Sequence, residues 1–121
     1  MATQEISSSK WQAFAQKFND LHQGSLMTVE SIDASDHREV VASESPLREF
    51  SFGPSNACSD AITLRLGGEG RREQLHQIIE PIHLKVRPGQ NGGKVLQIDG
   101  ESGSTLVTFH SGKIFELIAS L

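Results

Sequence analysis

Four basic side chains are spaced so that strand pairing would gather them into an anion-binding face. One of them alternates with the apolar residues of Ile62–Leu66, and three alternate with those of Ile82–Val86. Successive side chains of a strand point to opposite faces, so pairing of these two strands would place all four on one outer face. Such a face could bind phosphate or an acidic partner, although solvated antiparallel sheets show the same alternation. The candidate binding residues are Arg65, His83, Lys85 and Arg87.

A glycine-rich turn followed by two arginines is a second candidate anion site. The run Gly67-Gly68-Glu69-Gly70 follows the predicted strand Asp60–Leu66 and precedes a segment with helical spacing. Free backbone amides at the start of a helix can hold a phosphate. The run lacks the Gly-Lys-Ser/Thr ending of a P-loop and the third glycine of a dinucleotide fingerprint, which favours a plain flexible loop. The residues of this anion loop are Gly68, Gly70, Arg71 and Arg72.

The histidines and the single cysteine do not form a recognisable catalytic motif. No two of the five histidines are three or four residues apart, so we predict no metal site and no cofactor. His76 or His83 could act with Glu80 as an acid/base pair only if the fold brings them into one concave pocket. Cys58 has no evident base beside it, and no Gly-x-Ser-x-Gly motif is present. The sequence therefore predicts no enzyme.

Length and composition predict one domain spanning residues 1–121. The chain is 36% hydrophobic and 21% charged, which is typical of a globular protein. No apolar run approaches the roughly 20 residues of a membrane helix, and the first residues do not resemble a signal peptide. Cys58 cannot form an internal disulfide. We therefore expect a cytoplasmic protein that has no membrane partner.

The net charge of −4 is unevenly distributed along the chain. Residues 1–60 carry four basic and nine acidic side chains, whereas residues 61–94 carry six and three. An acidic chain repels the nucleic-acid backbone, which disfavours nucleic acid as a partner. Because residues 61–94 carry a net positive charge, a small anionic ligand or an acidic protein remains a candidate partner.

One amphipathic helix is predicted over Lys10–Gln23. Ser9 and Gln12 have the spacing of a capping box, and Gly24 stands where a left-handed C-terminal cap is expected. The helix has one apolar stripe, which must cover a large apolar surface. The stripe consists of Trp11, Phe14, Ala15, Phe18 and Leu21.

Short alternating segments after the helix predict strands. Pro46 implies an edge, a bulge or a break within the segment around it. The helical spacing of Arg71–Glu80 predicts a short helix or turn, and Ile114–Leu121 could be a short helix or an edge strand. We predict an α+β fold in which the N-terminal helix packs on a strongly bent, mostly antiparallel sheet of five or six strands, or on a small barrel. The predicted strands are Leu26–Ile32, Leu47–Phe52, Asp60–Leu66, Ile82–Val86, Lys94–Asp99 and Thr105–Phe109, and they are clearest at Ile62–Leu66, Ile82–Val86, Leu96–Ile98 and Val107–Phe109.

Two motifs resemble an uncharacterised bacterial family that is catalogued as a domain of unknown function. The first is the Trp-x-x-Phe of the helix, at Trp11 and Phe14. The second is His76-x-Ile78-x-x-Pro81, followed by a strand. The resemblance implies the same architecture over nearly the whole chain and brings no activity. Phe50-Ser-Phe52-Gly53 departs from the family's pattern.

Three functions are compatible with these observations. We expect a non-enzymatic binding or self-assembly module that forms a homo-oligomer. One alternative is an RNA-binding barrel of Sm-like type, which also has a helix before a bent sheet and would form a ring. The other is a small enzyme that uses His76 or His83 with Glu80.

Overall fold

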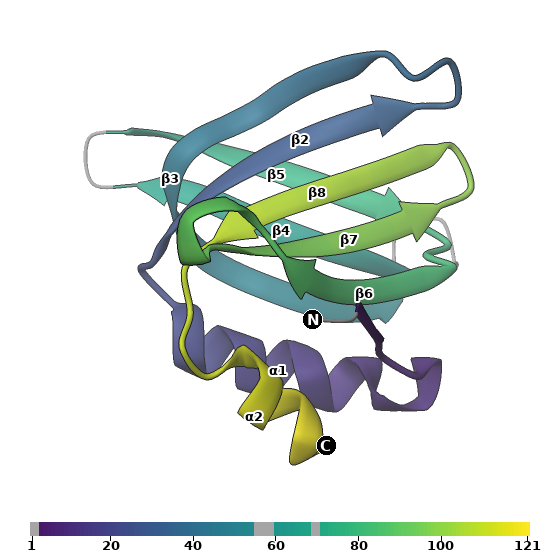
Figure 1. Ribbon diagram of the computed structural model, residues 1–121. Helices are drawn as coiled ribbons and strands as arrows, with labels where there is room; N and C mark the ends of the chain where they lie inside the picture. The colour runs from purple at the N-terminus through teal and green to yellow at the C-terminus, as the bar shows by residue number, and fades with distance from the viewer. Residues whose placement is uncertain (1–2, 55–59, 69–70) are drawn as a thin grey trace.

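The computed structural model describes residues 3–54, 60–68 and 71–121. Its strands form one antiparallel sheet in the order β1-β6-β7-β8-β2-β3-β4-β5, which rolls over on itself without closing (Figure 1). The strands are β1 Gln4–Glu5, β2 Leu26–Asp33, β3 Arg38–Pro54, β4 Asp60–Gly68, β5 Arg71–Ile79, β6 His83–Pro88, β7 Lys94–Gly100 and β8 Gly103–Phe109. The helices are η1 Ser8–Lys10, α1 Trp11–His22, η2 Gln90–Gly92 and α2 Ile114–Ala119.

The long strand β3 divides the sheet into two layers. Its first half pairs with β2, and its second half pairs with β4. The bend between the halves lies at Pro46, where the register shifts both before and after the proline. Glu44 has a φ of 45° there, and its N–H donates to Thr28 Oγ1 at 3.2 Å. Of the possibilities that Pro46 raised, a bulged strand is the one observed.

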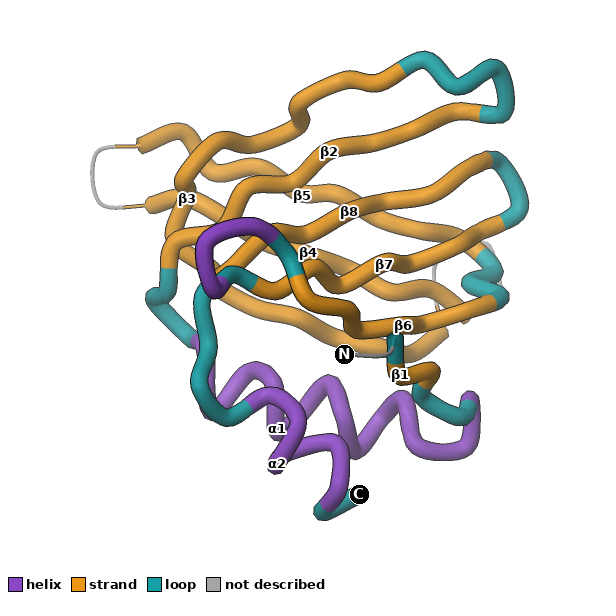
Figure 2. The backbone as a smooth tube through the Cα atoms, viewed as in Figure 1, coloured by secondary structure: helices purple, strands orange, loops and turns teal. Residues whose placement is uncertain are grey.

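The tube in Figure 2 shows the two layers facing each other, with α1 and α2 beyond one side of the sheets. The first layer contains β1, β6, β7, β8, β2 and the start of β3, and the second contains the end of β3, β4 and β5. Apolar side chains from both layers and from α1 form one buried core. Among its fully buried members are Phe14, Phe18, Phe50, Leu64, Leu84, Leu96 and Phe109.

Helix α1 confirms the predicted apolar stripe except at Leu21, which is exposed, because His22 takes the buried position at the end of the helix. Phe18 is fully buried, with ring centroids 5.1 Å from Phe50 and 5.3 Å from Phe109. Gly24 has the expected positive φ of 87°. The predicted capping box is wrong, because η1 leads into the helix and the N-cap residue Lys10 makes no side-chain cap bond. The apolar stripe therefore fixes the helix in place without a side-chain cap.

Two predictions about the sheet are also wrong. The described residues form eight strands and not five or six. The segment predicted to be a short helix or turn is the strand β5, whose apolar residues are divided between its two faces. The C-terminal segment is the helix α2, which was one of its two predicted states. No helix in the described part of the chain is both long and apolar enough to cross a membrane.

Candidate functional site

The predicted basic face does not form, because β4 pairs with β3 and β5 and not with β6. Arg65 lies on the outer face of the second layer. Its Nη1 is 3.3 Å from Glu49 Oε1, and its Nε is 3.4 Å from Glu73 Oε1. Arg65 is thus separated from the other three basic residues and lies between two carboxylates. The prediction failed because it assumed the wrong strand pairing.

The other three basic residues alternate along β6 on the outer face of the first layer. His83 Nδ1 lies 2.7 Å from Glu5 Oε2, and Lys85 Nζ lies 3.9 Å from Asp99 Oδ2. Arg87 is partly exposed at the end of the same row. Two of these three basic residues, His83 and Lys85, therefore face a carboxylate with which an incoming anion would have to compete.

Asp99 belongs to a polar network that the sequence did not indicate. Burial alone would raise the pKa of Asp99, but hydrogen bonds from Gln97 and Ser104 reverse that effect. Lys85 and His83 also contribute, and together these groups hold the pKa below its ordinary value. Gln97 Nε2 donates to Asp99 Oδ1 at 2.9 Å, and Ser104 Oγ donates to the same oxygen at 2.7 Å. Ser104 lies five residues after Asp99, opposite it in the hairpin of β7 and β8, so this part of the network is local in the sequence.

The predicted anion loop also lacks the geometry that the prediction required. Gly68 ends β4 with a φ of 98°, and Gly70 lies outside the described residues. Arg71 begins β5 and Arg72 is exposed on that strand, so a strand follows the glycines where a helix was expected. The turn therefore has no helix N-terminus to bind an anion.

His76 and His83 lie on opposite faces of the sheet. His76 faces inward, where its Nε2 is 3.0 Å from Thr105 Oγ1 in β8. Burial lowers the pKa of His76. His83 faces outward beside Glu5, and Glu80 lines a separate cavity with Trp11 and Ile82. The acid/base pair predicted for these residues therefore does not assemble.

The pocket beside His76, the seam cavity, lies where β5 meets the ends of β2, β7 and β8. It has a volume of about 160 Å³, and its lining includes Ser31, Asp33, His76, Ser104 and Thr105. The Oδ1 of Asp33 accepts hydrogen bonds from the N–H groups of Ser35 and His37, within its own turn. The seam cavity thus offers hydrogen bonds to a small polar molecule, with one histidine among its lining residues.

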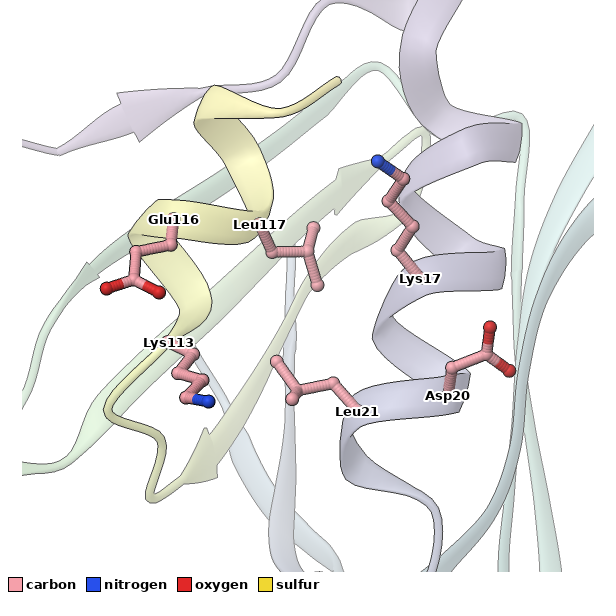
Figure 3. Close-up of a pocket in the computed structure, with 6 residues that line it drawn as sticks. All are labelled: Lys17, Asp20, Leu21, Lys113, Glu116 and Leu117. Atoms are coloured by element: carbon pink, nitrogen blue, oxygen red, sulfur yellow. The ribbon is translucent and has the colours of Figure 1, made fainter.

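A shallow groove separates α1 from α2, with a volume of about 390 Å³. Figure 3 shows Leu21 and Leu117 pointing toward each other from the two helices. Leu21 is 41% exposed and Leu117 is buried. The remaining lining residues are two cations and two anions, so the rim carries no net charge: Lys17, Asp20, Lys113 and Glu116.

Two of the four sheet edges are covered. The second half of β3 lies against α1, where Asn19 Oδ1 accepts the N–H of Phe50 at 2.9 Å. Gln23 Nε2 donates to the carbonyl of Arg48 at 3.2 Å. The N-terminal segment covers β6 through β1, and the N–H of Ile6 extends that pairing by donating to the Leu84 carbonyl at 2.8 Å. Helix side chains and the short strand β1 therefore satisfy backbone groups that an edge would leave unpaired.

The first half of β3 has an uncovered but irregular edge. Its register with β2 shifts twice, and it carries the charged residues Arg38, Glu39 and Glu44. Bulges and charges are the usual features that prevent an edge from pairing with another chain.

The outer edge of β5 is long, and its second half has neither a bulge nor a charged residue to prevent pairing with another chain. The N–H of Glu80 donates to the Asp60 carbonyl at 2.9 Å, so even-numbered residues of β5 bond to β4 and odd-numbered ones face away. Among the described residues, no hydrogen bond joins those outward backbone groups to another element, although the Ile79 carbonyl lies beside Gly100 of β7, where Gln77 and Ile79 also line the seam cavity. Leu75 and Ile79 are 66% and 38% exposed beside this edge. The sequence did not indicate this edge, because the segment was predicted to be a helix.

Comparison with known proteins supplies no relative for this chain. No family model, curated protein or solved structure matches it. The resemblance to the uncharacterised bacterial family therefore stays a prediction.

Proposed function

We propose that the protein is a non-enzymatic binding module that recognises an extended polypeptide by adding it to β5 as a further strand. The open edge of β5 is the observation that carries this proposal. Strand addition provides affinity through main-chain hydrogen bonds and specificity through alternate side chains. Leu75 and Ile79 would supply the apolar contacts on the outer face.

The placement of the other candidate residues supports a binding function over the alternatives. An acid/base enzyme needs its groups in one cavity, whereas His76 and His83 lie on opposite faces. Binding of RNA to a basic face is not favoured either, because Arg65 is separated from the β6 cations. The edge of β5 needs no such convergence, since its own backbone provides the binding groups.

A random linear peptide library displayed on phage, selected on the immobilised protein, tests the proposal. We expect enrichment of peptides with apolar residues at alternate positions. Leu75→Lys and Ile79→Lys should weaken the selected peptides roughly tenfold or more, because a charged edge opposes strand addition. Val40→Lys is the matched control, since Val40 is 59% exposed on the other layer. Equal binding by all three variants, or no enrichment, would contradict the proposal.

A further inference from the structure

We infer that the strand received by β5 is β5 of a second copy, antiparallel to the first across a two-fold axis at Gln77. This inference rests on the proposed function, because it names the partner of the same edge. A closed pair of this kind is isologous, so the edge must be complementary to itself. Both the backbone and the side chains of β5 meet that requirement.

The backbone requirement follows from which residues face outward. The odd-numbered residues Leu75, Gln77 and Ile79 direct their N–H and C=O groups away from β4. In a two-fold pair centred on Gln77, that residue lies opposite its own copy and Leu75 lies opposite Ile79. These pairs join outward-facing groups to outward-facing groups, so their hydrogen bonds can form together.

The side chains select this register among the possible ones. Leu75 and Ile79 then meet in two apolar pairs on the outer face, where each strand now leaves them exposed. A pair centred on Glu73 would bring two carboxylates together, and one centred on His76 would place Ile79 opposite Glu73. A pair centred on Leu75 makes one apolar contact where the Gln77 register makes two.

The positions of the charged residues in β5 also favour a register that uses the second half of the strand. Arg72 and Glu73 lie in its first half, and Glu73 is already in an ion pair with Arg65. The Gln77 register uses only residues 75–79, so it leaves that ion pair intact. Five paired residues make a small interface, and we therefore expect a reversible dimer with a dissociation constant between about 1 µM and about 1 mM.

Light scattering and sedimentation equilibrium across that concentration range measure the dimer directly. We expect the wild-type mass to rise from one to two chains. Leu75→Lys and Ile79→Lys should keep the protein monomeric, whereas the control Val40→Lys should dimerise like the wild type. The amides of Leu75 and Gln77 should become protected from hydrogen exchange as the concentration rises, because the partner strand then bonds to them.

Charges introduced at the axis test the register. Gln77→Glu and Gln77→Lys should each weaken the dimer roughly three- to tenfold, because like charges then lie opposite each other. An equimolar mixture of the two variants should form a heterodimer that is tighter than either homodimer. If Gln77→Lys alone strengthens the dimer, Gln77 faces Glu73 of the other copy and the proposed axis is wrong.

The results separate failure of this inference from failure of the proposed function. A protein that stays monomeric over the whole range overturns pairing with a second copy, and the peptide selection still decides whether β5 binds another strand. A dimer that is insensitive to Leu75→Lys and Ile79→Lys also overturns the inference, because its interface lies elsewhere.

Discussion

Replacing His22 with leucine should remove half of the acid sensitivity of this protein's folding. His22 is 3% exposed, and its ring lies 4.4 Å from the ring centroid of Phe18 and 5.1 Å from that of Phe109. Neither ring nitrogen makes a hydrogen bond of ordinary length and angle, and the Phe18 carbonyl is the polar group that acts on the ring. Burial lowers the pKa of His22, and the Phe18 carbonyl one turn earlier only partly opposes that shift. The folded protein therefore disfavours a proton at this position.

The sign and the size of the effect follow from proton linkage. In the unfolded chain His22 has a pKa of 6.5, so on acidification the unfolded state takes up the proton first. The stability contributed by neutral His22 is present above pH 6.5 and is lost as the pH falls toward the lower folded pKa. The limiting slope is about 1.4 kcal/mol per pH unit for one histidine. Burial also lowers the pKa of His76, so the two histidines together approach about 2.7 kcal/mol per pH unit.

Urea unfolding at a series of pH values between neutrality and the onset of carboxylate titration measures this slope. His22→Leu should show about half of the wild-type slope, and at neutral pH it should change the free energy of unfolding by less than about 1 kcal/mol. His110→Gln is the control, because His110 is an exposed histidine. A wild-type slope in His22→Leu would refute this account of the buried ring.

Two further variants test the backbone contacts of the fold. Asn19→Leu should lower the free energy of unfolding by about 1–3 kcal/mol, because the N–H of Phe50 loses its acceptor; Asn19→Asp keeps that acceptor, and equal losses in urea unfolding would contradict the assigned role. Gly103→Ala should cost about 2–4 kcal/mol by the same measurement, because Gly103 has a φ of 148° and an added Cβ would overlap the Ile32 carbonyl oxygen. A loss below about 1 kcal/mol would show that this turn can relax.

The helix and most strands were predictable because each carries one clear period of apolar residues. Segment 71–79 was mispredicted because Leu75, Ile78 and Ile79 have helical spacing, although Ile78 faces the core and the other two face outward. The exposed pair creates the apparent helical period. The feature proposed here to bind a partner is therefore the one that obscured the strand.

The candidate site depended on strand pairing, which alternation alone does not specify. The strands that contain Arg65 and His83 each carry basic residues on one face. Nothing in the sequence showed that the segment between these two strands is itself a strand, β5, and that β4 pairs with it. The contact between His76 and Thr105 likewise joins segments that are distant in the sequence. Such contacts are set by the tertiary fold and leave no local pattern.

The place of β2 at the centre of the sheet has a consequence for synthesis of the chain. β2 pairs on one side with β3, which follows within a few residues, and on the other side with β8, which begins at Gly103. As the polypeptide leaves the ribosome, the second side of β2 has no partner until β8 has been synthesised. Over that interval the nascent protein exposes a strand that lies inside the finished sheet.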